Sequence, residues 1–333
     1  TAHRDSQGDV TLNEYATVLR VPFLMKAAAT MIAPKLVTRL RKIQGEYDII
    51  HIHHPDPMSC LALYLSGYKG PVILHWHSDI LKQGVLLKFY QPLQSWLIRR
   101  ASTIVGTTPL YLKASPFLQK AQQKTVVIPI GIPEPIRQKE LAAEIRAKYK
   151  GKKIIFALGR MVKYKGFAYL IKAAHQLDDD CIILIGGKGP LHNKLQALIE
   201  TEGVDKRVKL IGFIKGEELP AYYEACDLFC LSSIMKTEAF AIAQVEAMSF
   251  GKPVVATRIP GSGVSWVNAD GISGLNVEPK DSGALADAIQ RILTDEELYG
   301  QLSVGARRRY ETTFTQEKMV ERCLQLYKRI IDK

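Results

Sequence analysis

Residues 228–257 read LFCLSSIMKTEAFAIAQVEAMSFGKPVVAT, and the fold of the chain is predicted from this stretch. The run Leu228–Ser232 is almost wholly apolar without alternation, which is typical of a parallel strand covered on both faces. Glu238–Phe250 is predicted to form a helix, because Gly251 and a proline two residues later end helices. Val254–Thr257 then reads as a second buried strand. The stretch therefore predicts a strand–helix–strand unit of a parallel sheet.

Short β-branched runs and longer helical patterns alternate along the whole chain. The other predicted strands are Asp48–His53, Val72–His75, Thr103–Gly106, Val126–Pro129, Lys153–Gly159, Cys181–Gly186, Val208–Gly212 and Gly274–Val277. The predicted helices between them include Phe167–Leu177, Leu191–Glu202 and Gly216–Ala225. This order predicts an α/β fold with doubly wound sheets, in which ligands bind outside the carboxyl ends of the strands.

A chain of 333 residues is longer than one core usually serves, so two domains are expected. The boundary is predicted near Pro133–Lys153, where a proline-containing loop leads into a charged helical stretch at Arg137–Lys150. The pattern indicates two Rossmann-like domains, 1–135 and 136–314, that face each other across a cleft. Tyr310–Lys333 reads as a closing helix. The residues spaced for packing on it are Met319, Leu324, Leu326 and Ile330.

Basic residues are concentrated in the first half. Residues 1–150 hold 20 basic and 10 acidic side chains, whereas residues 151–333 hold 25 and 23. The basic half is expected to face an anionic membrane surface, a phosphorylated lipid or a nucleic acid. Two amphipathic runs, Val21–Ile43 and Ile80–Arg100, favour a peripheral membrane face. Ordinary core helices with snorkelling lysines are the alternative for these runs.

Several protein classes are disfavoured by what the sequence lacks. No apolar run reaches the roughly 18 to 20 residues of a membrane-spanning helix, and no signal peptide is visible. Nucleic-acid binding is not expected, because interleaved exposed aromatics and a known module are missing. The five cysteines are scattered without zinc-site spacing, which predicts reduced thiols in a cytoplasmic protein.

Two glutamates are the main candidates for ligand binding. Glu238 is predicted at the helix N-terminus, where the dipole attracts anions, and a simple helix-end acid is the alternative. Glu246 follows after eight residues, or roughly 12 Å of helix, which is the length of a sugar diphosphate linked to a ribose. One carboxylate would accept sugar hydroxyls and the other ribose hydroxyls. Glu246 has apolar neighbours, so we expect it to be exposed or to have a partner.

Cations and glycines follow two other predicted strands. Arg160 follows a strand that ends at Gly159, and Lys165 precedes a helix, so both suit a diphosphate. Two solvated surface cations are the alternative. Gly187 lies in a glycine-rich turn, Ile185–Pro190, that lacks P-loop spacing. This turn brings the backbone close to a nucleotide, or it is only a tight turn.

Histidines end or follow two strands of the first half. His51, His53 and His54 belong to the first of them, and His75 and His77 to the second. At strand ends that face a cleft, such side chains can donate to a leaving phosphate or a sugar hydroxyl. A zinc site is the rival interpretation, but His75 and His77 would need a third ligand. No metal site is therefore expected.

These motifs resemble those of family 4 glycosyltransferases, which have the GT-B fold. The resemblance covers nearly the whole chain. It rests on Glu238 and Glu246 in an E-x7-E motif, followed by Gly251–Thr257. Gly159-Arg160 with Lys165-Gly166 is a second marker, and Ile128–Ile132 resembles the stretch that closes the first domain. The resemblance implies that the C-terminal helix crosses back, so that 315–333 completes the first domain.

The resemblance also implies roles for the matching residues. Glu238 would lie by the donor sugar and Glu246 would hold the ribose. Arg160 and Lys165 would bind the diphosphate and stabilise the leaving group. His77 would contact the donor sugar near the reaction centre. Backbone N–H groups for sugar and phosphate would come from Phe240, Ala241 and Ile242. The base would pack at Gly212 and Phe213.

The activity that the resemblance implies is hexose transfer with retention of configuration, independent of metal and with no cofactor beyond the donor. The donor would be a GDP- or UDP-sugar, and the acceptor a glycan or a lipid-linked glycan. Bacterial polysaccharide or glycolipid synthesis, in the cytoplasm or on the inner face of the cytoplasmic membrane, is the expected setting. A GT-B epimerase or phosphorylase is the alternative, although an epimerase carboxylate set and a phosphorylase cofactor lysine are not evident.

Two departures from the family pattern concern the donor and the start of the chain. Ala241 stands where many relatives have glycine, which narrows the room for the donor sugar. The first strand of the family and its glycine-rich loop are not found. Thr1–Gly8 reads as a loop, and it resembles the family segment that comes after the second strand. We therefore expect the first domain to be incomplete in this chain.

Overall fold

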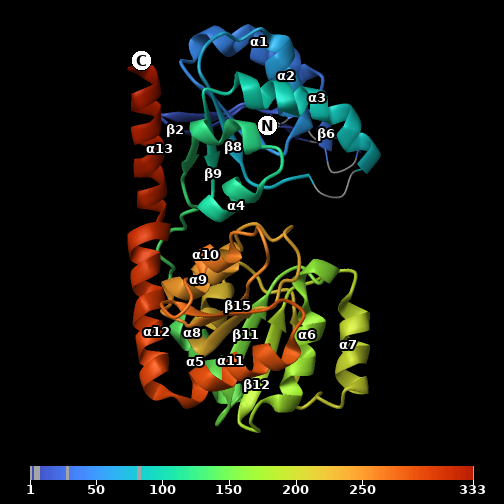
Figure 1. Cartoon of the computed structure of the whole chain (residues 1–333), viewed down its shortest axis with the longest axis vertical. Helices are drawn as coiled ribbons and strands as arrows, with labels where there is room; N and C mark the ends of the chain where they lie inside the picture. Colours follow the sequence, from blue (N-terminus) through green and yellow to red (C-terminus); the bar gives the residue numbers. More distant parts are fainter. Residues whose placement is uncertain (1, 4–7, 28–29, 81–83, 333) are drawn as a thin grey trace. The chain divides into compact units, whose positions relative to one another are not determined.

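Packing divides the chain into two compact units, each of which is described by itself (Figure 1). The computed structural model describes residues 2–3, 8–27, 30–80 and 84–332. Unit 1 comprises Thr1–Thr107, Ser115–Ile128 and Cys323–Lys333, and unit 2 comprises Thr108–Ala114 and Pro129–Arg322. Only the part of the last helix from Cys323 onward belongs to unit 1, whereas the expected segment began at residue 315. Most of the loop predicted at Thr1–Gly8 lies outside the described residues.

Unit 1 contains a parallel sheet in the order β10–β9–β8–β7. Its strands are β7 (Ile50–His54), β8 (Val72–Trp76), β9 (Thr103–Gly106) and β10 (Thr125–Val127), which confirms the predicted strands to within two residues. Its helices are α1 (Lys35–Ile43), α2 (Pro57–Ser66) and α3 (Gly84–Arg100). Asp56 begins α2, because its carboxylate accepts the N–H groups of Met58 and Ser59 at 3.0 and 3.3 Å.

The prediction of one amphipathic run over Val21–Ile43 is wrong. Short strands occupy its first part, and only α1 is helical. Pro34 would lie in the interior of a helix over the whole run, where it removes a hydrogen bond and clashes with the preceding turn. The short strands that precede α1 are β1 (Ala2–His3), β2 (Val10–Asn13), β3 (Ala16–Val18), β4 (Val21–Pro22), β5 (Met25–Ala27) and β6 (Thr30–Ile32).

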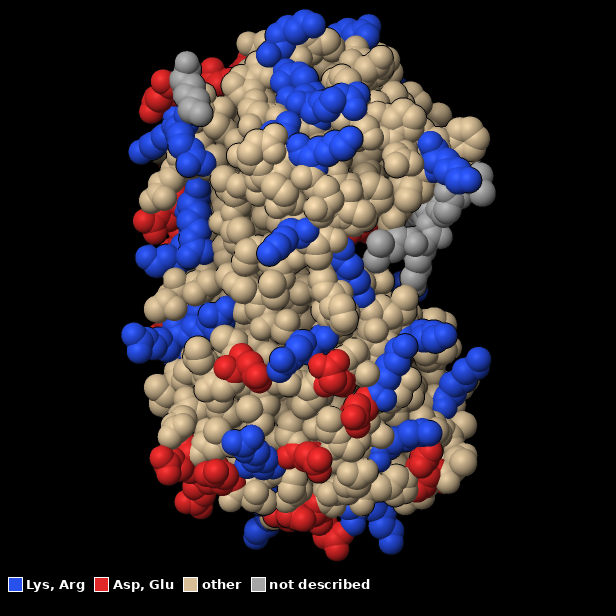
Figure 2. Space-filling model, in the orientation of Figure 1, with Lys and Arg blue, Asp and Glu red and all other residues tan. Residues whose placement is uncertain are grey.

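Within the second run, α3 covers Gly84–Arg100, and residues 81–83 lie outside the described residues. Among the helices that the structure describes, none is long and apolar enough to cross a bilayer. On the face drawn in Figure 2, basic side chains dominate over unit 1, whereas both signs mix over unit 2. Of the features that predicted a peripheral membrane face, the basic charge of unit 1 and the helix α3 therefore remain.

Unit 2 contains a parallel sheet in the order β13–β12–β11–β14–β15–β16. Its strands are β11 (Lys153–Leu158), β12 (Cys181–Gly186), β13 (Val208–Gly212), β14 (Leu228–Leu231), β15 (Val254–Thr257) and β16 (Gly274–Val277). This is the doubly wound order, which reverses between β11 and β14. The predicted strands are confirmed to within one residue, because their continuous apolar runs fill both faces of the sheet.

Helices cover both faces of this sheet (Figure 1). Alternate residues of β11 separate the two cores: Phe156 faces the core that holds Tyr223 and Val245, whereas Ile155 faces the core that holds Leu170 and Ile289. The helices of the unit are α4 (Pro109–Ala114), α5 (Lys139–Lys148), α6 (Phe167–Ala173), α7 (His192–Thr201), α8 (Leu219–Ala225), α9 (Ile242–Ser249), α10 (Val264–Val267), α11 (Ser282–Thr294) and α12 (Glu296–Arg309).

The last helix, α13 (Gln316–Ile331), is shorter than the predicted Tyr310–Lys333, because Tyr310–Phe314 forms a π-helical turn that continues α12. Leu326 is buried, and Met319 and Ile330 are partly buried. Leu324 is 52% exposed, so its predicted packing role is wrong. The five cysteines are free, as predicted, and four of them are buried.

Two glycines of α12 give a matched test of the packing in unit 2. A Cβ atom at Gly305 would lie 1.8 Å from the carbonyl oxygen of Ile272, whereas one at Gly300 meets nothing within 4 Å. Gly300→Ala is expected to stabilise the unit by up to ~1 kcal/mol, because alanine loses less backbone entropy in a helix. Gly305→Ala is expected to destabilise it by ~1–3 kcal/mol, because backbone must shift. Urea unfolding measures both, and equal effects would contradict this packing.

Candidate active site

The candidate site in unit 2 lies at the carboxyl ends of β11 and β14, where the strand order reverses and parallel sheets bind ligands. Gly166 brings the loops after these strands together. Its φ is +67°, and a Cβ atom there would lie 2.0 Å from the carbonyl oxygen of Ser232. The Ser232 hydroxyl donates to the carbonyl of Lys165 at 3.0 Å, and the Ile234 N–H donates to the carbonyl of Tyr164 at 2.8 Å. The loops that follow β11 and β14 are therefore in direct contact.

A buried ion pair lies between these loops. Lys165 Nζ is 2.5 Å from Glu238 Oε2, and both side chains are about nine-tenths buried. The Ser233 hydroxyl donates to the same oxygen at 2.8 Å, and the Ser262 hydroxyl donates to the Glu238 carbonyl. Among the described residues, no group donates to Glu238 Oε1, so that oxygen is available to a ligand. Two predicted site residues thus meet directly.

The predicted helix over Glu238–Phe250 is wrong at its start, because α9 begins only at Ile242. Ala241 has φ 62° and ψ 81°, which is left-handed backbone that cannot continue a helix. Glu238 is therefore held by Lys165 and not by a helix dipole. This excludes the alternative that Glu238 is only an acidic residue at the N-terminus of a helix. The 12 Å estimate of helical rise between Glu238 and Glu246 also fails.

The turn before α9 offers backbone donors. Within the described chain, no carbonyl accepts the N–H groups of Phe240, Ala241 and Ile242. Consecutive free N–H groups beside a left-handed residue form a concave site that suits an anion. The left-handed conformation costs an alanine roughly 1–2 kcal/mol, and glycine adopts it freely. The departure at Ala241 is therefore a matter of backbone strain as well as of room.

Glu246 has the partner that its apolar setting requires. Tyr223 on α8 donates its hydroxyl to Glu246 Oε2 at 2.6 Å. Burial raises the pKa of Glu246, and the hydrogen bond from Tyr223 opposes this rise. The pKa of Tyr223 is raised well above its usual value by burial and by the nearby carboxylate, so the hydroxyl keeps its proton. This partner confirms the expectation from the sequence.

Glu246 and Tyr223 line a pocket of about 220 Å³ with Gly216 and the apolar side chains of Leu219 and Pro220. Tyr223, Leu219 and Pro220 were not predicted as site residues. Several predicted helices contain similar apolar residues near their start, and no sequence pattern distinguishes this helix from the others. Neither residue predicted to pack the base lines this pocket. Gly212 has φ +74°, and Phe213 is 63% exposed, with Lys188 Nζ 5.2 Å from its ring centre.

Main-chain contacts join the glycine turns after β11, β12 and β13. The Gly187 N–H donates to the Gly212 carbonyl at 2.6 Å, and the Gly159 N–H donates to the Gly186 carbonyl at 3.1 Å. A Cβ atom at Gly187 would lie 2.0 Å from the Gly159 carbonyl oxygen. Gly187 is thus required for close packing, whatever it binds. Arg160 is exposed and forms no ion pair with the described residues.

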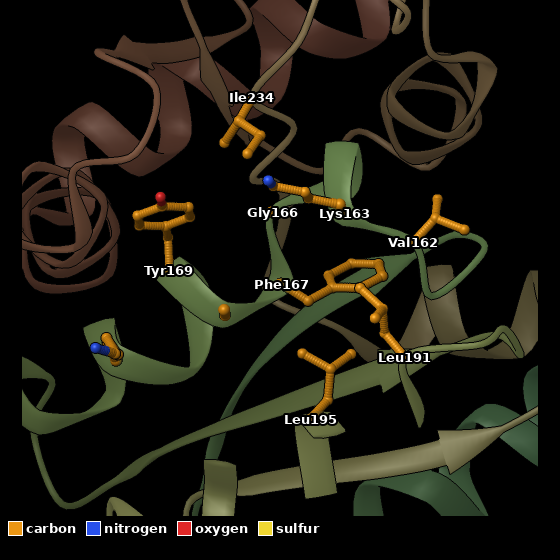
Figure 3. Close-up of a pocket in the computed structure, with 10 residues that line it drawn as sticks. Val162, Lys163, Gly166, Phe167, Tyr169, Leu191, Leu195 and Ile234 are labelled. Carbon is orange, nitrogen blue, oxygen red and sulfur yellow. The ribbon is translucent and has the colours of Figure 1, made fainter. Parts of the chain in front are cut away.

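A second pocket of unit 2, of about 300 Å³, lies beside Gly166 (Figure 3). Phe167, Leu191 and Leu195 point into it, and Lys163 lies near Ile234 across from them. None of the predicted site residues lines it. The lining of this pocket is largely apolar, whereas a nucleotide sugar needs several polar partners.

Buried hydroxyls support Glu238, and the sequence did not reveal their role. The Thr257 hydroxyl at the end of β15 donates to the Ser233 carbonyl, and Ser262 follows in the next loop. Hydroxyl residues directly after neighbouring buried strands are the signal that could have found them. Such residues are common at strand ends, so the signal is weak.

Unit 1 carries four histidines on one face of its sheet. His53 and His75 are neighbours in the register of β7 and β8, and His53 Nδ1 lies 2.7 Å from His77 Nε2. Burial lowers the pKa of His51 and of His77 to about 4, so both are neutral at pH 7. His54 points to the other face and stacks on Trp76. His77 belongs to unit 1 and the other predicted catalytic residues to unit 2, so their meeting remains a prediction.

The comparisons with known proteins agree with these motifs. Residues 138–309 match the family described as Glycosyl transferases group 1, and residues 3–134 match Glycosyltransferase Family 4. The chain is 30% identical to O-antigen chain mannosyltransferase C of Escherichia coli over 310 residues, 93% of this chain and 82% of that protein. It is 29% identical to D-rhamnosyltransferase WbpZ of Pseudomonas aeruginosa over 296 residues, 87% and 76% of the two.

Solved structures share the fold. HepE of Anabaena, solved with UDP, has a TM-score of 0.76 at 22% identity over 89% of this chain and 82% of that one. Sucrose-phosphate synthase of Thermosynechococcus elongatus has a TM-score of 0.79 at 22% identity over 97% and 86%. The predicted GT-B fold of two Rossmann-like domains is thereby confirmed. With these matches over nearly its whole length, the chain belongs to the glycosyl transferases group 1 family and is a glycosyltransferase.

Proposed function

We propose that the chain transfers a hexose from a GDP- or UDP-sugar to a glycan or lipid-linked acceptor, with retention of configuration and without a metal in the transfer step. The observation that carries this proposal is the Lys165–Glu238 pair at the point where the sheet order reverses. The setting would be bacterial polysaccharide or glycolipid synthesis at the inner membrane face. The E. coli relative is named an O-antigen mannosyltransferase, and HepE structures contain UDP or UDP-glucose, which supports the same class of donor.

The charges of the site suggest how a donor is held. The Lys165 ammonium, already paired with Glu238, would share its charge with the diphosphate, and the exposed Arg160 fork would add a bidentate contact. Glu238 Oε1 would accept a sugar hydroxyl. The N–H groups at Phe240–Ile242 would bind sugar and phosphate oxygens, and all these donors would stabilise the charge that grows on the leaving diphosphate.

The nucleoside and the acceptor would use other groups. Glu246, held by Tyr223, would accept the ribose hydroxyls at its pocket. His77 would contact the donor sugar from the acceptor unit. The basic excess of residues 1–150 suits an anionic acceptor, such as a lipid diphosphate in a membrane.

A donor panel tests the proposed function directly. GDP- and UDP-hexoses are assayed for hydrolysis and for transfer to lipid-linked acceptors in anionic vesicles, in EDTA, at low and high salt. One donor is expected to react with retention, and transfer is expected to weaken at high salt, because the vesicle contact is electrostatic. Failure of every donor with an otherwise folded chain, or an absolute need for metal, would contradict the proposal.

Glu246 is tested by nucleotide binding. Glu246→Gln keeps a hydrogen-bond acceptor for Tyr223 but removes the charge that the ribose hydroxyls would meet. Affinity for UDP or GDP is expected to fall by about 10- to 100-fold, because charge-assisted hydrogen bonds contribute about 1.5–3 kcal/mol. Glu246→Ala is expected to abolish binding. Calorimetric titration measures both variants.

Two controls separate binding from folding. Glu200→Gln, on the exposed surface of α7, is expected to bind as the wild type does. Because burial raises the folded pKa of Glu246, the wild type loses stability as the pH rises through that pKa, and Glu246→Gln does not. The Gln variant is therefore expected to be at least as stable as the wild type at pH 7. Unchanged nucleotide affinity in it would end the ribose role.

The buried ion pair is tested by a double-mutant cycle. Lys165→Met or Glu238→Gln alone leaves one buried group without its partner, and each is expected to lower the free energy of unfolding, by up to about 3–5 kcal/mol. The double variant is expected to recover most of this stability but no transfer activity. Chemical unfolding and the transfer assay measure the two effects.

The pair Lys318–Glu321, in which both side chains are exposed, serves as the comparison, since Glu321→Gln is expected to change stability by less than about 0.5 kcal/mol. A double variant as unstable as the sum of the single ones would show that the two groups are not coupled. A fully active double variant would remove both residues from the donor site.

A further inference from the structure

The four histidines of unit 1 form a cluster that the proposed transfer reaction does not fully use. His51 and His53 alternate along β7, and His75 and His77 do so along and just beyond β8, so all four share one face of the sheet. His51, His53 and His75 each place one ring nitrogen within 4.8 Å of those of the other two. The neighbouring strand β7 therefore supplies two of these three imidazoles, and His77 is not one of the three.

Buried nitrogens of this cluster have no partner. His51 Nε2 and both ring nitrogens of His75 accept or donate no hydrogen bond within the described chain. Buried polar atoms are normally satisfied, and leaving them unpaired is unfavourable. The unpaired nitrogens of His51 and His75 are therefore available to a ligand.

Outer contacts orient two of the rings. His51 Nδ1 lies 2.7 Å from the Tyr327 hydroxyl, and His53 Nδ1 lies 2.7 Å from His77 Nε2. Each ring therefore uses one nitrogen for an outer partner, which leaves its Nε2 for a ligand. The same division between ligand nitrogen and outer partner is found in metal-binding histidines.

The cluster is accessible. His51 and His53 line a pocket of about 490 Å³ together with Asp56 and Ser59. The Asp56 carboxylate is already used at the start of α2, where it accepts the N–H groups of Met58 and Ser59 and the Ser59 hydroxyl. The pocket therefore gives a small ion a path to the imidazoles and offers no free carboxylate.

We propose that His51, His53 and His75 bind one transition-metal ion of the zinc class, with water from the pocket in a fourth position. Three imidazoles without a free carboxylate or thiolate favour Zn²⁺, Co²⁺, Ni²⁺ or Cu²⁺ over Mg²⁺ or Ca²⁺. Three protein ligands and one open position are also an established arrangement for zinc. The ion would occupy unit 1 whether or not the proposed transfer reaction is correct.

The test is Co²⁺ binding to the full chain, expressed without a polyhistidine tag. Co²⁺ is titrated while its visible absorption is recorded, since tetrahedral Co²⁺ absorbs strongly there, and bound metal is counted by mass spectrometry after gel filtration. One ion per chain is expected. His53→Ala and His75→Ala are expected to weaken binding by more than ~100-fold, and Tyr327→Phe by ~10- to 100-fold, because it removes only an outer partner.

His175→Ala is the matched control, because His175 is an exposed histidine of unit 2 whose loss is expected to change nothing. Thermal unfolding without metal shows whether each variant is folded, and the exposed His53 gives the answer if the buried His75 variant does not fold. Absence of Co²⁺ binding to the wild type at millimolar concentration would overturn the proposal. So would binding that the His53 variant leaves unchanged.

Discussion

The ion pair between Lys165 and Glu238 connects the loops after the two central strands of unit 2. Its geometry depends on two glycines. A Cβ atom at Gly159 would lie 2.8 Å from Lys165 Cε, and one at Gly166 would collide with the Ser232 carbonyl. Two buried charges are stable only when their attraction and further hydrogen bonds offset desolvation, and the Ser233 hydroxyl provides one such bond. The candidate donor site therefore rests on a polar contact that the surrounding backbone must fit closely.

Much of the fold could be predicted because buried parallel strands leave a simple signal. The runs Lys153–Leu158 and Cys181–Gly186 are apolar at nearly every position, and their short length and β-branched residues favour strands that are covered on both faces. The start of α9 could not be predicted. It depends on the left-handed backbone of Ala241, a conformation that propensity assigns to glycine and not to alanine.

The sequence named candidate site residues one by one, but it did not reveal the contacts between them. The apolar neighbours of Glu246 required a partner, yet Tyr223 lies 23 positions earlier on another helix, and no local pattern marks it. The histidines were recognised as strand-end residues, whereas their assembly depends on the register that sets His53 beside His75. Tyr327, 276 positions from His51, could be found only from the packing of the chain.

The glycine turns at Gly159, Gly187 and Gly212 present main chain, and main-chain atoms are the same in every protein. An edge of this kind can hold a group that all activated sugars share, but it has no means of telling one sugar or base from another. If the proposed donor binds at this edge, its discrimination would come from side chains around it, such as Phe213 and Ile242, which are 63% and 42% exposed. Under that proposal, single surface substitutions would change the choice of donor while the fold stays intact. Proteins with this backbone arrangement could therefore differ in donor while they keep the same fold.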